Sequence, residues 1–448
     1  MKKIFLTLLG LAGLQTLVAA QFASPTMAGF RSMHQSLHTA PATLPDYKYY
    51  LALPHLEFRV DNNFALNDLF TPEGDSLRLD LSKWTSANTG PLQLQLSQNV
   101  RLLDVGFALS RKNYLYFGSS VQVNQNIALP TGLLQFAEVG RTLDMNGLDL
   151  NVTALAEYHA GMVQKIGPFT LGFRYRMLNG LFNLQTVRSD LRLDMSSDSI
   201  QMQTDLEMRA SNLQAQDSIG MPLSGKFPDI SSLVPLSENK GQSMDFGLGY
   251  TFRDKLSVDV SLLNIGNSIT WKSNLSTYTS KGQFHYTGPI INMGVDSAGN
   301  AFQGIADTIT SQIEEKLGLD TVGSTTSYTT SMTEQMLVHL NFRPYKFLGV
   351  GLIYRRPLNE VQLFSDAAMI APYVDLRLGK LLSTRVHYSS SENRKSIGGL
   401  VALRLLGLQV SAGVESIDMF SKQSSTRYFQ FQGGLSLCFG YRNKAKKA

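Results

Sequence analysis

Two histidines are the first residues of this chain whose spacing could support chemistry. His34 and His38 are four residues apart, a spacing that places two imidazoles on one face of a helix, where they could share a metal ion. No cysteine or carboxylate lies near them to supply a third ligand. We therefore predict no metal site and interpret both histidines as polar residues of a mobile segment.

The rest of the sequence lacks the signatures of catalysis. It contains no G-x-S-x-G elbow, no H-E-x-x-H pair, no phosphate-binding loop and no G-x-G-x-x-G fingerprint in a βαβ context. We predict that the protein is not an enzyme and uses no cofactor. The formal charge of +5 falls mostly on Lys2, Lys3 and a basic C-terminus. No basic face for nucleic acid is therefore predicted.

A larger set of polar residues stands at every second position of apolar segments. Alternate side chains of a β-strand point to opposite faces, so these residues would share an interior face. The candidate lumen-facing residues are Glu157, His159, Arg174, Arg176, Asp245, Arg253, Asp259, His339, Arg343, Arg385 and His387, and Asp104, Arg355, Asp375, Arg377, Arg404 and Glu415 follow the same rule. Two interpretations stay open: ion pairs across the interior with contacts to a plug, or selectivity residues of a conducting pore with a weak bias toward anions.

The strands that would carry these side chains are most evident at the end of the chain. Between Tyr428 and Tyr441 one face carries Phe429, Phe431, Leu435, Leu437, Phe439 and Tyr441, and the other carries Gln430, Gln432, Gly434, Ser436, Cys438 and Gly440. Only a β-strand separates residues in this way. The same alternation recurs upstream, starting at Tyr47.

Short and long connections between these segments largely alternate. Tight connections are predicted near 111–113, 165–167, 254–255, 343–346, 379–380 and 405–407, and long ones near 61–90, 126–149, 211–242 and 272–334. Such strands describe an outer-membrane barrel, with its short turns in the periplasm. We predict an all-β fold, a single transmembrane antiparallel β-barrel over residues 47–441 with about 14 strands. The alternative is 16 strands, if 189–197 and 199–210 belong to the wall instead of a projecting hairpin.

The N-terminus resembles an export signal. Lys2 and Lys3 precede an apolar stretch that ends in Val18-Ala19-Ala20, the pattern of a signal peptide over residues 1–20. A content of 43% hydrophobic residues, 37 glycines and only 17% charged residues suits a barrel that hides apolar surface by alternation. We predict export to the outer membrane of a Gram-negative cell. The single Cys438 cannot form an internal disulfide.

Three further segments lie outside the predicted wall. Residues 21–46 are mostly polar and precede the first strand. A helix is predicted at about 301–318 in an extracellular loop, because Phe302, Ile305, Ile309, Ile313 and Leu317 have helical spacing. It would act as a lid or docking surface, or only pack on neighbouring loops. Residues 442–448 would form a basic periplasmic tail.

The last strand also carries a pattern linked to assembly. Gln432, Gly434, Leu437 and Phe439 have a spacing that resembles the signal read by the barrel-assembly machinery on final strands. This machinery and outer-membrane lipid are therefore expected partners. In other barrels the signal usually ends the chain, whereas here Tyr441 and the basic tail follow it.

Three further stretches resemble a known family. They are Ala40-Pro41-Ala42 before Leu44 to Lys48, then Ala156 to Gly161 with Leu171 to Tyr175 and Gly180-Leu181, and Asn239 to Gly247 with Ser261 to Gly266, Ile269 to Trp271 and Ser327 to Thr330. They resemble an uncharacterised Bacteroidota outer-membrane β-barrel family (domain of unknown function). That family is distantly similar to the long-chain fatty-acid transporter and the type IX secretion barrel subunit. The resemblance spans roughly residues 38 to 441.

The resemblance implies a function for the barrel. In the fatty-acid transporter an N-terminal segment enters the barrel as a hatch, so residues 21–46 are expected to be a hatch segment. Passive transport or binding of small hydrophobic molecules follows as the expected role. The alternative is a non-transporting scaffold, or a secretion-associated barrel, that binds a surface or periplasmic partner protein. A continuous apolar cavity reaching the wall would favour transport, and a lumen filled by charged pairs without a cavity would exclude it.

Overall fold

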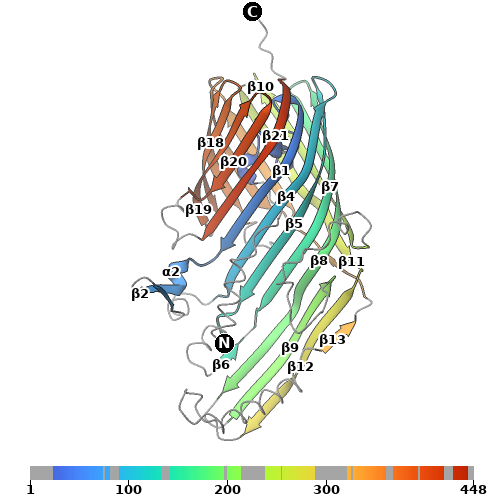
Figure 1. Cartoon of the computed structure of the whole chain (residues 1–448), viewed down its shortest axis with the longest axis vertical. Helices are drawn as coiled ribbons and strands as arrows, with labels where there is room; N and C mark the ends of the chain where they lie inside the picture. The colour runs from blue at the N-terminus through green and yellow to red at the C-terminus, as the bar shows by residue number, and fades with distance from the viewer. Residues whose placement is uncertain are drawn as a thin grey trace, which may run out of the picture.

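The alternating segments form one closed wall of antiparallel strands in a computed structural model (Figure 1). The structure describes residues 24–73, 76–80, 90–132, 142–144, 146–195, 199–212, 238–253, 255–287, 320–323, 326–359, 367–391, 394–417 and 427–441. The wall consists of β1 (Tyr47–Asn62), β4 (Leu92–Ala108), β5 (Asn113–Leu129), β7 (Asp149–Ile166), β8 (Phe169–Met195), β10 (Lys240–Phe252), β11 (Leu256–Trp271), β15 (Gln335–Phe342), β16 (Leu348–Pro357), β17 (Met369–Leu378), β18 (Leu382–Ser391), β19 (Arg394–Leu405), β20 (Leu408–Glu415) and β21 (Tyr428–Tyr441). The predicted all-β barrel of 14 strands is therefore confirmed.

Pairing of the first and last strands closes the barrel. One edge of β1 pairs with β4, and the other pairs with β21 in the register Tyr47↔Tyr441 and Phe58↔Phe431. Every wall strand therefore has a neighbour on both sides. A closed ring leaves no long hydrogen-bonding edge exposed, which is the condition for strands to cross a lipid layer.

The two faces of the wall differ as the alternation predicts. On β21, Phe431, Leu435 and Phe439 are exposed, whereas Gln432 and Ser436 are buried. Exposed apolar side chains continue around the outside, among them Leu171 on β8, Leu248 on β10, Val374 on β17 and Val401 on β19. An apolar outer band with a polar interior is typical of a transmembrane barrel.

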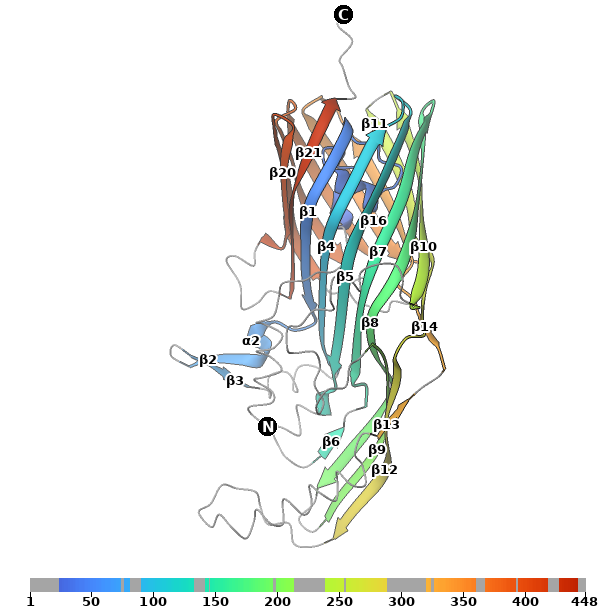
Figure 2. The same cartoon turned by 45° about the vertical axis from the view of Figure 1, so that its right-hand side comes forward.

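A sheet extends beyond one end of the barrel and settles the strand count (Figure 2). The second half of β8 leaves the wall and pairs with β9 (Ser199–Ser211), which pairs with β12 (Leu275–Thr287). We call this the projecting sheet; β6 (Thr142–Asp144) and β13 (Asp320–Gly323) extend it. The described parts of the segments 189–197 and 199–210 thus belong to paired strands outside the wall, which gives fourteen strands instead of sixteen.

The two ends of the barrel carry different connections. The predicted tight turns, such as the one between β7 and β8, lie at the end where the described chain reaches Tyr441 (Figure 1). The projecting sheet lies at the opposite end, as does a small hairpin of β2 (Phe70–Glu73) and β3 (Ser76–Leu79) after the helical turn α2 (Leu66–Leu69). We call these the turn end and the loop end.

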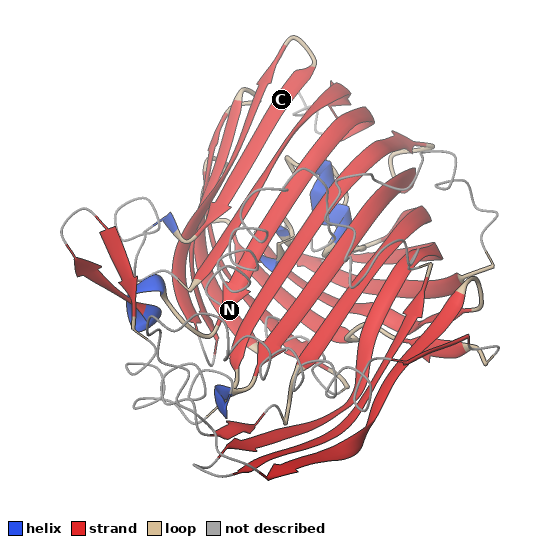
Figure 3. Cartoon of the chain, turned by 60° about the horizontal axis from the view of Figure 1, so that its bottom comes forward, coloured by secondary structure: helices blue, strands red, loops and turns tan. Residues whose placement is uncertain are grey.

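Two short 3-10 helices lie inside the ring of strands, near the turn end (Figure 3). They are η1 (Pro25–Met27) and η2 (His34–His38), and both belong to residues 24–46, the N-terminal segment. None of the helices in the described ranges is long and apolar enough to cross a membrane. The predicted signal peptide (1–20), the loop helix (301–318) and the basic tail (442–448) lie outside the described residues and stay predictions.

Candidate functional site

The N-terminal segment is held in the lumen by hydrogen bonds to the inner wall. Arg385 on β18 donates from Nη1 to the carbonyl oxygens of Thr26 (2.6 Å) and Ala28 (2.8 Å). Ser24 donates to Glu415 Oε1 (2.6 Å), and Ser32 donates to Ser383 Oγ (2.8 Å). The segment is thus attached at several points to β18 and β20 but is joined covalently only to β1.

Apolar contacts supplement these hydrogen bonds. Met27, Phe30 and Met33, spaced by three in the sequence, are fully buried and pack with Leu400 and Ala402 of β19. The wall also has a glycine where the segment packs closely against it. A Cβ at Gly172 of β8 would lie 2.1 Å from the Pro41 carbonyl, so glycine is required there for the segment to fit.

The two histidines of the segment are not mobile surface residues, and that interpretation is wrong. His34 and His38 are buried because η2 lies inside the lumen. His34 stacks on Tyr50 with ring centroids 4.6 Å apart. Burial lowers the pKa of His34 to about 4 and the pKa of His38 well below its usual value. Both imidazoles are therefore neutral at pH 7.

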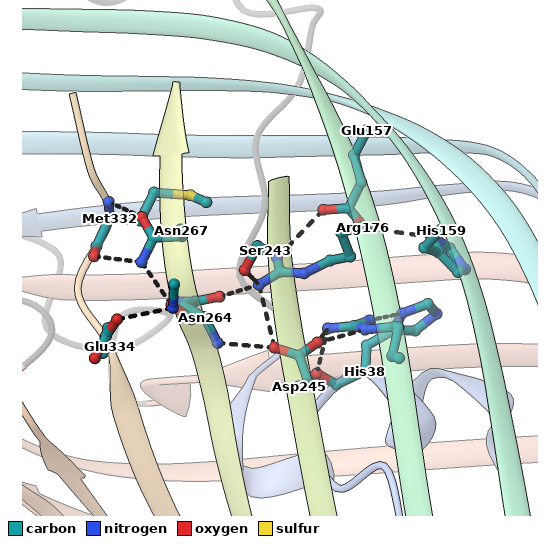
Figure 4. A network of polar contacts seen from close by, with 12 residues as sticks. His38, Glu157, His159, Arg176, Ser243, Asp245, Asn264, Asn267, Met332 and Glu334 are labelled. Atoms are coloured by element: carbon teal, nitrogen blue, oxygen red, sulfur yellow. Dashed lines mark hydrogen bonds and ion pairs between the residues drawn. The ribbon is translucent and has the colours of Figure 1, made fainter. Parts of the chain in front are cut away.

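His38 connects the segment to a charged network on the wall (Figure 4). Its Nε2 lies 2.7 Å from Asp104 Oδ2, and Arg174 Nη1 donates to its Nδ1. Since Nδ1 accepts, we assign the proton to Nε2, which donates to Asp104. The geometry therefore defines one tautomer of His38.

Arg176 is the centre of the same network (Figure 4). Its Nη2 donates to Ser243 Oγ (2.7 Å), Asp245 Oδ1 (3.2 Å) and Asn264 Oδ1, and its Nη1 lies 3.3 Å from Glu157 Oε2. These partners come from β7, β10 and β11. Buried charges of opposite sign thus neutralise one another across neighbouring strands.

The other predicted lumen residues form a second group of contacts. Their pairs are Arg385 with Asp375 (2.7 Å), Arg343 with Asp375 (3.5 Å), His339 with Asp259 (3.0 Å), His387 with Glu415 (2.9 Å) and Arg377 with Asp46 (3.0 Å). Together with the first network, these pairs fill the lumen at the level of the N-terminal segment. This state matches the first of the two interpretations of these residues, namely ion pairs across the interior with contacts to a plug.

Arg253 is placed differently from its prediction. It lies in the turn after β10, with a φ of 50°, and is exposed. Its guanidinium covers the ring of Phe252 on the outside of the barrel, with 4.9 Å between Cζ and the ring centroid. The alternation that places Thr251 inside ends at Phe252, because β10 ends there.

Arg101 is a lumen residue that the alternation did not identify. The ladder of β4 has an irregularity between Arg101 and Leu103, so Leu102 and Leu103 are both exposed while Arg101 and Asp104 are both buried. An extra residue in one strand reverses the side-chain parity beyond it. The sequence signal for this bulge is two adjacent leucines where strict alternation requires one.

The assembly pattern lies on the seam of the barrel. Gln432 is buried, Leu437 pairs with Leu51 of β1, and Phe439 is exposed on the outer face. A Cβ at Gly434 would lie 2.4 Å from the His55 ring. Glycine at this position lets β1 and β21 close with His55 inside.

In the described part of the wall, the backbone ladder between β11 and its neighbours is interrupted next to the Arg176 network. The first part of β11 pairs with β15 up to Leu263, and its last part pairs with β14 (Tyr328–Thr330) from Ile269. Between them, Asn264 and Asn267 donate from their side chains to the carbonyls of Thr333 (2.8 Å) and Met332 (2.9 Å). Side-chain amides thus replace the backbone ladder at this point, which we call the wall gap.

An apolar cluster borders the wall gap on the side of the loop end. Leu155, Leu178, Ile269, Trp271 and Tyr328 are buried together, with Met332 packed against them. Along β8 the inner face therefore changes from Arg174 and Arg176 to Leu178 with increasing distance from the tight turns. At β8 and β11 the inner face is therefore charged toward the turn end and apolar toward the loop end. On the β1 and β19 side an ion pair of Asp61 and Arg394 remains toward the loop end.

One group of side chains has the spacing of a metal site. Donor atoms of His38, Asp104 and His159 lie within 4.8 Å of one another. However, Nε2 of His38 carries a proton toward Asp104 when Nδ1 accepts from Arg174, so it has no lone pair for a metal. The contacts therefore fit a hydrogen-bond network in which His159 lies 3.3 Å from Glu157.

These features define a class of protein: a closed transmembrane β-barrel of the outer-membrane type, with a polar lumen occupied by its own N-terminal segment. The chain belongs to a family of unknown function, DUF5723, which matches residues 41–415. No curated protein matches the chain.

Three solved structures align with most of this chain at low identity. The P. putida toluene transporter TodX has 9% identity and a TM-score of 0.43, over 91% of this chain and 95% of that one. The Ralstonia pickettii toluene transporter TbuX has 9% identity and a TM-score of 0.43, over 95% and 96%. The translocator domain of the autotransporter NalP from Neisseria meningitidis has 10% identity and a TM-score of 0.33, over 88% of each chain.

Proposed function

We propose that this protein is a gated outer-membrane barrel for the passive transport of small hydrophobic molecules. The observation that carries the proposal is the wall gap, which lies between the apolar cluster and the N-terminal segment. A hydrophobic molecule would enter at the loop end, bind against Trp271 and Leu178, and leave through the gap when the segment shifts. The route involves no covalent step.

The state described here is closed, and its charge-filled lumen is the feature that was expected to exclude transport, so transport requires a different state in which the segment has moved. Charged pairs and the N-terminal segment fill the lumen toward the turn end, and the cavity beside them measures only ≈ 50 Å³. Transport along the whole barrel axis would therefore require the segment to move. The segment is attached by separate hydrogen bonds and not by a sheet ladder. These bonds can break without disrupting the strand pairing of the wall, which supports a displaceable segment.

A disulfide between the segment and the wall tests this proposal. The hydroxyl oxygens of Ser32 and Ser383 are 2.8 Å apart, so Ser32→Cys with Ser383→Cys, in a Cys438→Ser background, gives two facing thiols. We expect the oxidised protein in liposomes to admit a monoaromatic hydrocarbon at least about tenfold more slowly, and reductant to restore the rate. The two single-cysteine variants are the matched controls. An unchanged rate in fully cross-linked protein would reject the gating role.

A second candidate function rests on the projecting sheet. Its ion pairs and Lys281 present mixed charge to solvent beyond the barrel, which suits a docking face for a partner protein. In this scaffold function, mild extraction would recover a defined partner. Arg188→Glu with Lys281→Glu would abolish that recovery while leaving hydrocarbon uptake unchanged, whereas the Ser32–Ser383 disulfide would leave recovery intact.

A further inference from the structure

A small cavity lies between the N-terminal segment and the wall, beside the Arg176 network. It has a volume of ≈ 50 Å³, and Arg101, Arg174, Arg176, Arg355, His38 and Gln335 are among its lining residues. No carboxylate side chain lines it among the described residues. Four guanidinium groups and no lining acid give this cavity a cationic lining.

Two of the lining side chains have donors without an acceptor. Arg101 is 2% exposed, and neither of its Nη atoms has a hydrogen-bond partner among the described residues. The nearest carboxylate oxygen paired with it, Glu57 Oε2, is 3.8 Å from Nη2, too far for a hydrogen bond. Gln335 is 5% exposed, and its Nε2 is likewise without a partner. Buried donors are rarely left in this condition in folded proteins.

The nearby carboxylate of Asp245 already accepts hydrogen bonds from two of the lining arginines. Asp245 receives hydrogen bonds from Arg174 Nε (2.6 Å) and Arg176 Nη2 (3.2 Å). These contacts orient the two guanidinium groups and do not supply an acceptor inside the cavity. The unsatisfied groups facing the cavity are therefore donors, and one of them is a cation.

We propose that this cavity binds one small oxyanion, such as phosphate or a carboxylate ion. An oxyanion offers only acceptors, matches the planar donor fork of arginine, and fits a volume that would otherwise hold a few water molecules. Because His38 and Thr39 of the N-terminal segment also line the cavity, the bound anion stabilises the seated segment. The site is independent of whether the barrel transports hydrophobic molecules.

Binding to the full-length barrel in detergent tests the proposal directly. Phosphate and acetate are titrated separately. A bulky sulfonate that cannot enter the cavity keeps the ionic strength constant. Binding is measured by calorimetry and by the thermal unfolding midpoint. We expect one of the two anions to bind and raise the midpoint. Phosphate binding identifies a tetrahedral site, and acetate binding identifies a planar one. If both behave like the sulfonate, the cavity holds water only and the proposal is overturned.

Variants locate the site. Arg101→Gln is expected to weaken anion binding by about tenfold or more, since it removes a charge-assisted hydrogen bond. Gln335→Leu is expected to weaken it by about threefold or more. Asn99→Leu is the matched control, because Asn99 of β4 is also buried with unpartnered side-chain atoms but does not line the cavity. If Arg101→Gln fails to insert, Gln335→Leu decides: anion binding equal to that of Asn99→Leu would overturn the assignment.

Discussion

The lumen and the projecting sheet contain the same kind of ion pair in opposite surroundings. In the lumen, Arg385 Nε lies 2.7 Å from Asp375 Oδ1, and both side chains are 0% exposed. In the projecting sheet, Arg188 Nε lies 2.8 Å from Asp205 Oδ1, with side chains 46% and 26% exposed. The distances are nearly equal, so a difference in their energetics must come from solvent. The lumen pairs therefore determine structure, whereas the outer pairs mainly determine surface charge.

Removal of one partner from the lumen pair should give the largest effect. Asp375→Ala would leave Arg385 buried without its carboxylate, which typically costs about 3–5 kcal/mol. Because the same guanidinium holds Thr26 and Ala28, the N-terminal segment should become sensitive to protease. The measurement is the midpoint of the heat-induced gel shift together with limited proteolysis.

The double variant Asp375→Ala with Arg385→Met is the control for this prediction. It removes both charges and should recover part of the lost stability, since no unpaired ion remains. A loss below about 1 kcal/mol in the single variant would show that water reaches the pair and would remove the contrast with the outer sheet.

A steric change at the crossing of the segment should have the next largest effect. Gly172→Ala would place a Cβ 2.1 Å from the Pro41 carbonyl, and overpacking of this kind costs about 1–3 kcal/mol. Gly399→Ala is the matched control, because its Cβ would meet nothing closer than 3.6 Å. Hydrogen exchange of residues 24–46 is the measurement. Equal exchange in both variants would contradict the close packing.

Acid should weaken the seating of the segment through His34. Burial lowers the pKa of His34 from 6.5 to about 4, so the unseated state binds more protons between these values. The contribution of His34 to the stability of the seated segment is therefore fully present above pH 6.5. It is lost as the pH decreases toward 4, by about 1.4 kcal/mol per pH unit. Hydrogen exchange of the segment between pH 7 and pH 5 measures it. His34→Gln should flatten this dependence, and an unchanged slope in that variant would assign the effect to other groups.

The smallest effect is expected in the projecting sheet. Asp205→Ala removes an exposed partner of Arg188, and pairs of this kind contribute about 0–1 kcal/mol. The unfolding midpoint should change little and should respond to salt more than the midpoint of the Asp375 variant does. A loss as large as that of Asp375→Ala would show that the outer pair is as important as the lumen pair.

Much of the wall could be predicted from the sequence because its signal is local. On β21 each residue is either apolar and outward or polar and inward, and the tight turns follow within a few residues. Strict alternation does not predict the position of Arg101, because a single bulge reverses the parity of β4. The strand count also depended on a long-range fact, namely that β9 pairs with the projecting half of β8 and with β12, outside the ring of wall strands.

The interior was less predictable for a different physical reason. His38, Asp104 and Arg174 come from the N-terminal segment, β4 and β8, and no sequence spacing connects them. The short, polar composition of residues 24–46 is equally suited to a solvated linker. Its burial depends on contacts that the closed wall provides, namely charges that require partners and the apolar surface of β19.

The seam between β1 and β21 has a consequence for how the molecule is made. The N-terminal segment leads directly into β1, and the strand that pairs with the free edge of β1 is the last one in the wall. During synthesis that edge has no partner until the whole wall has been produced, so the contact that completes the ring has the greatest separation along the chain. Closure therefore requires the complete wall, and it fixes the segment inside a ring that its own continuation helps to seal.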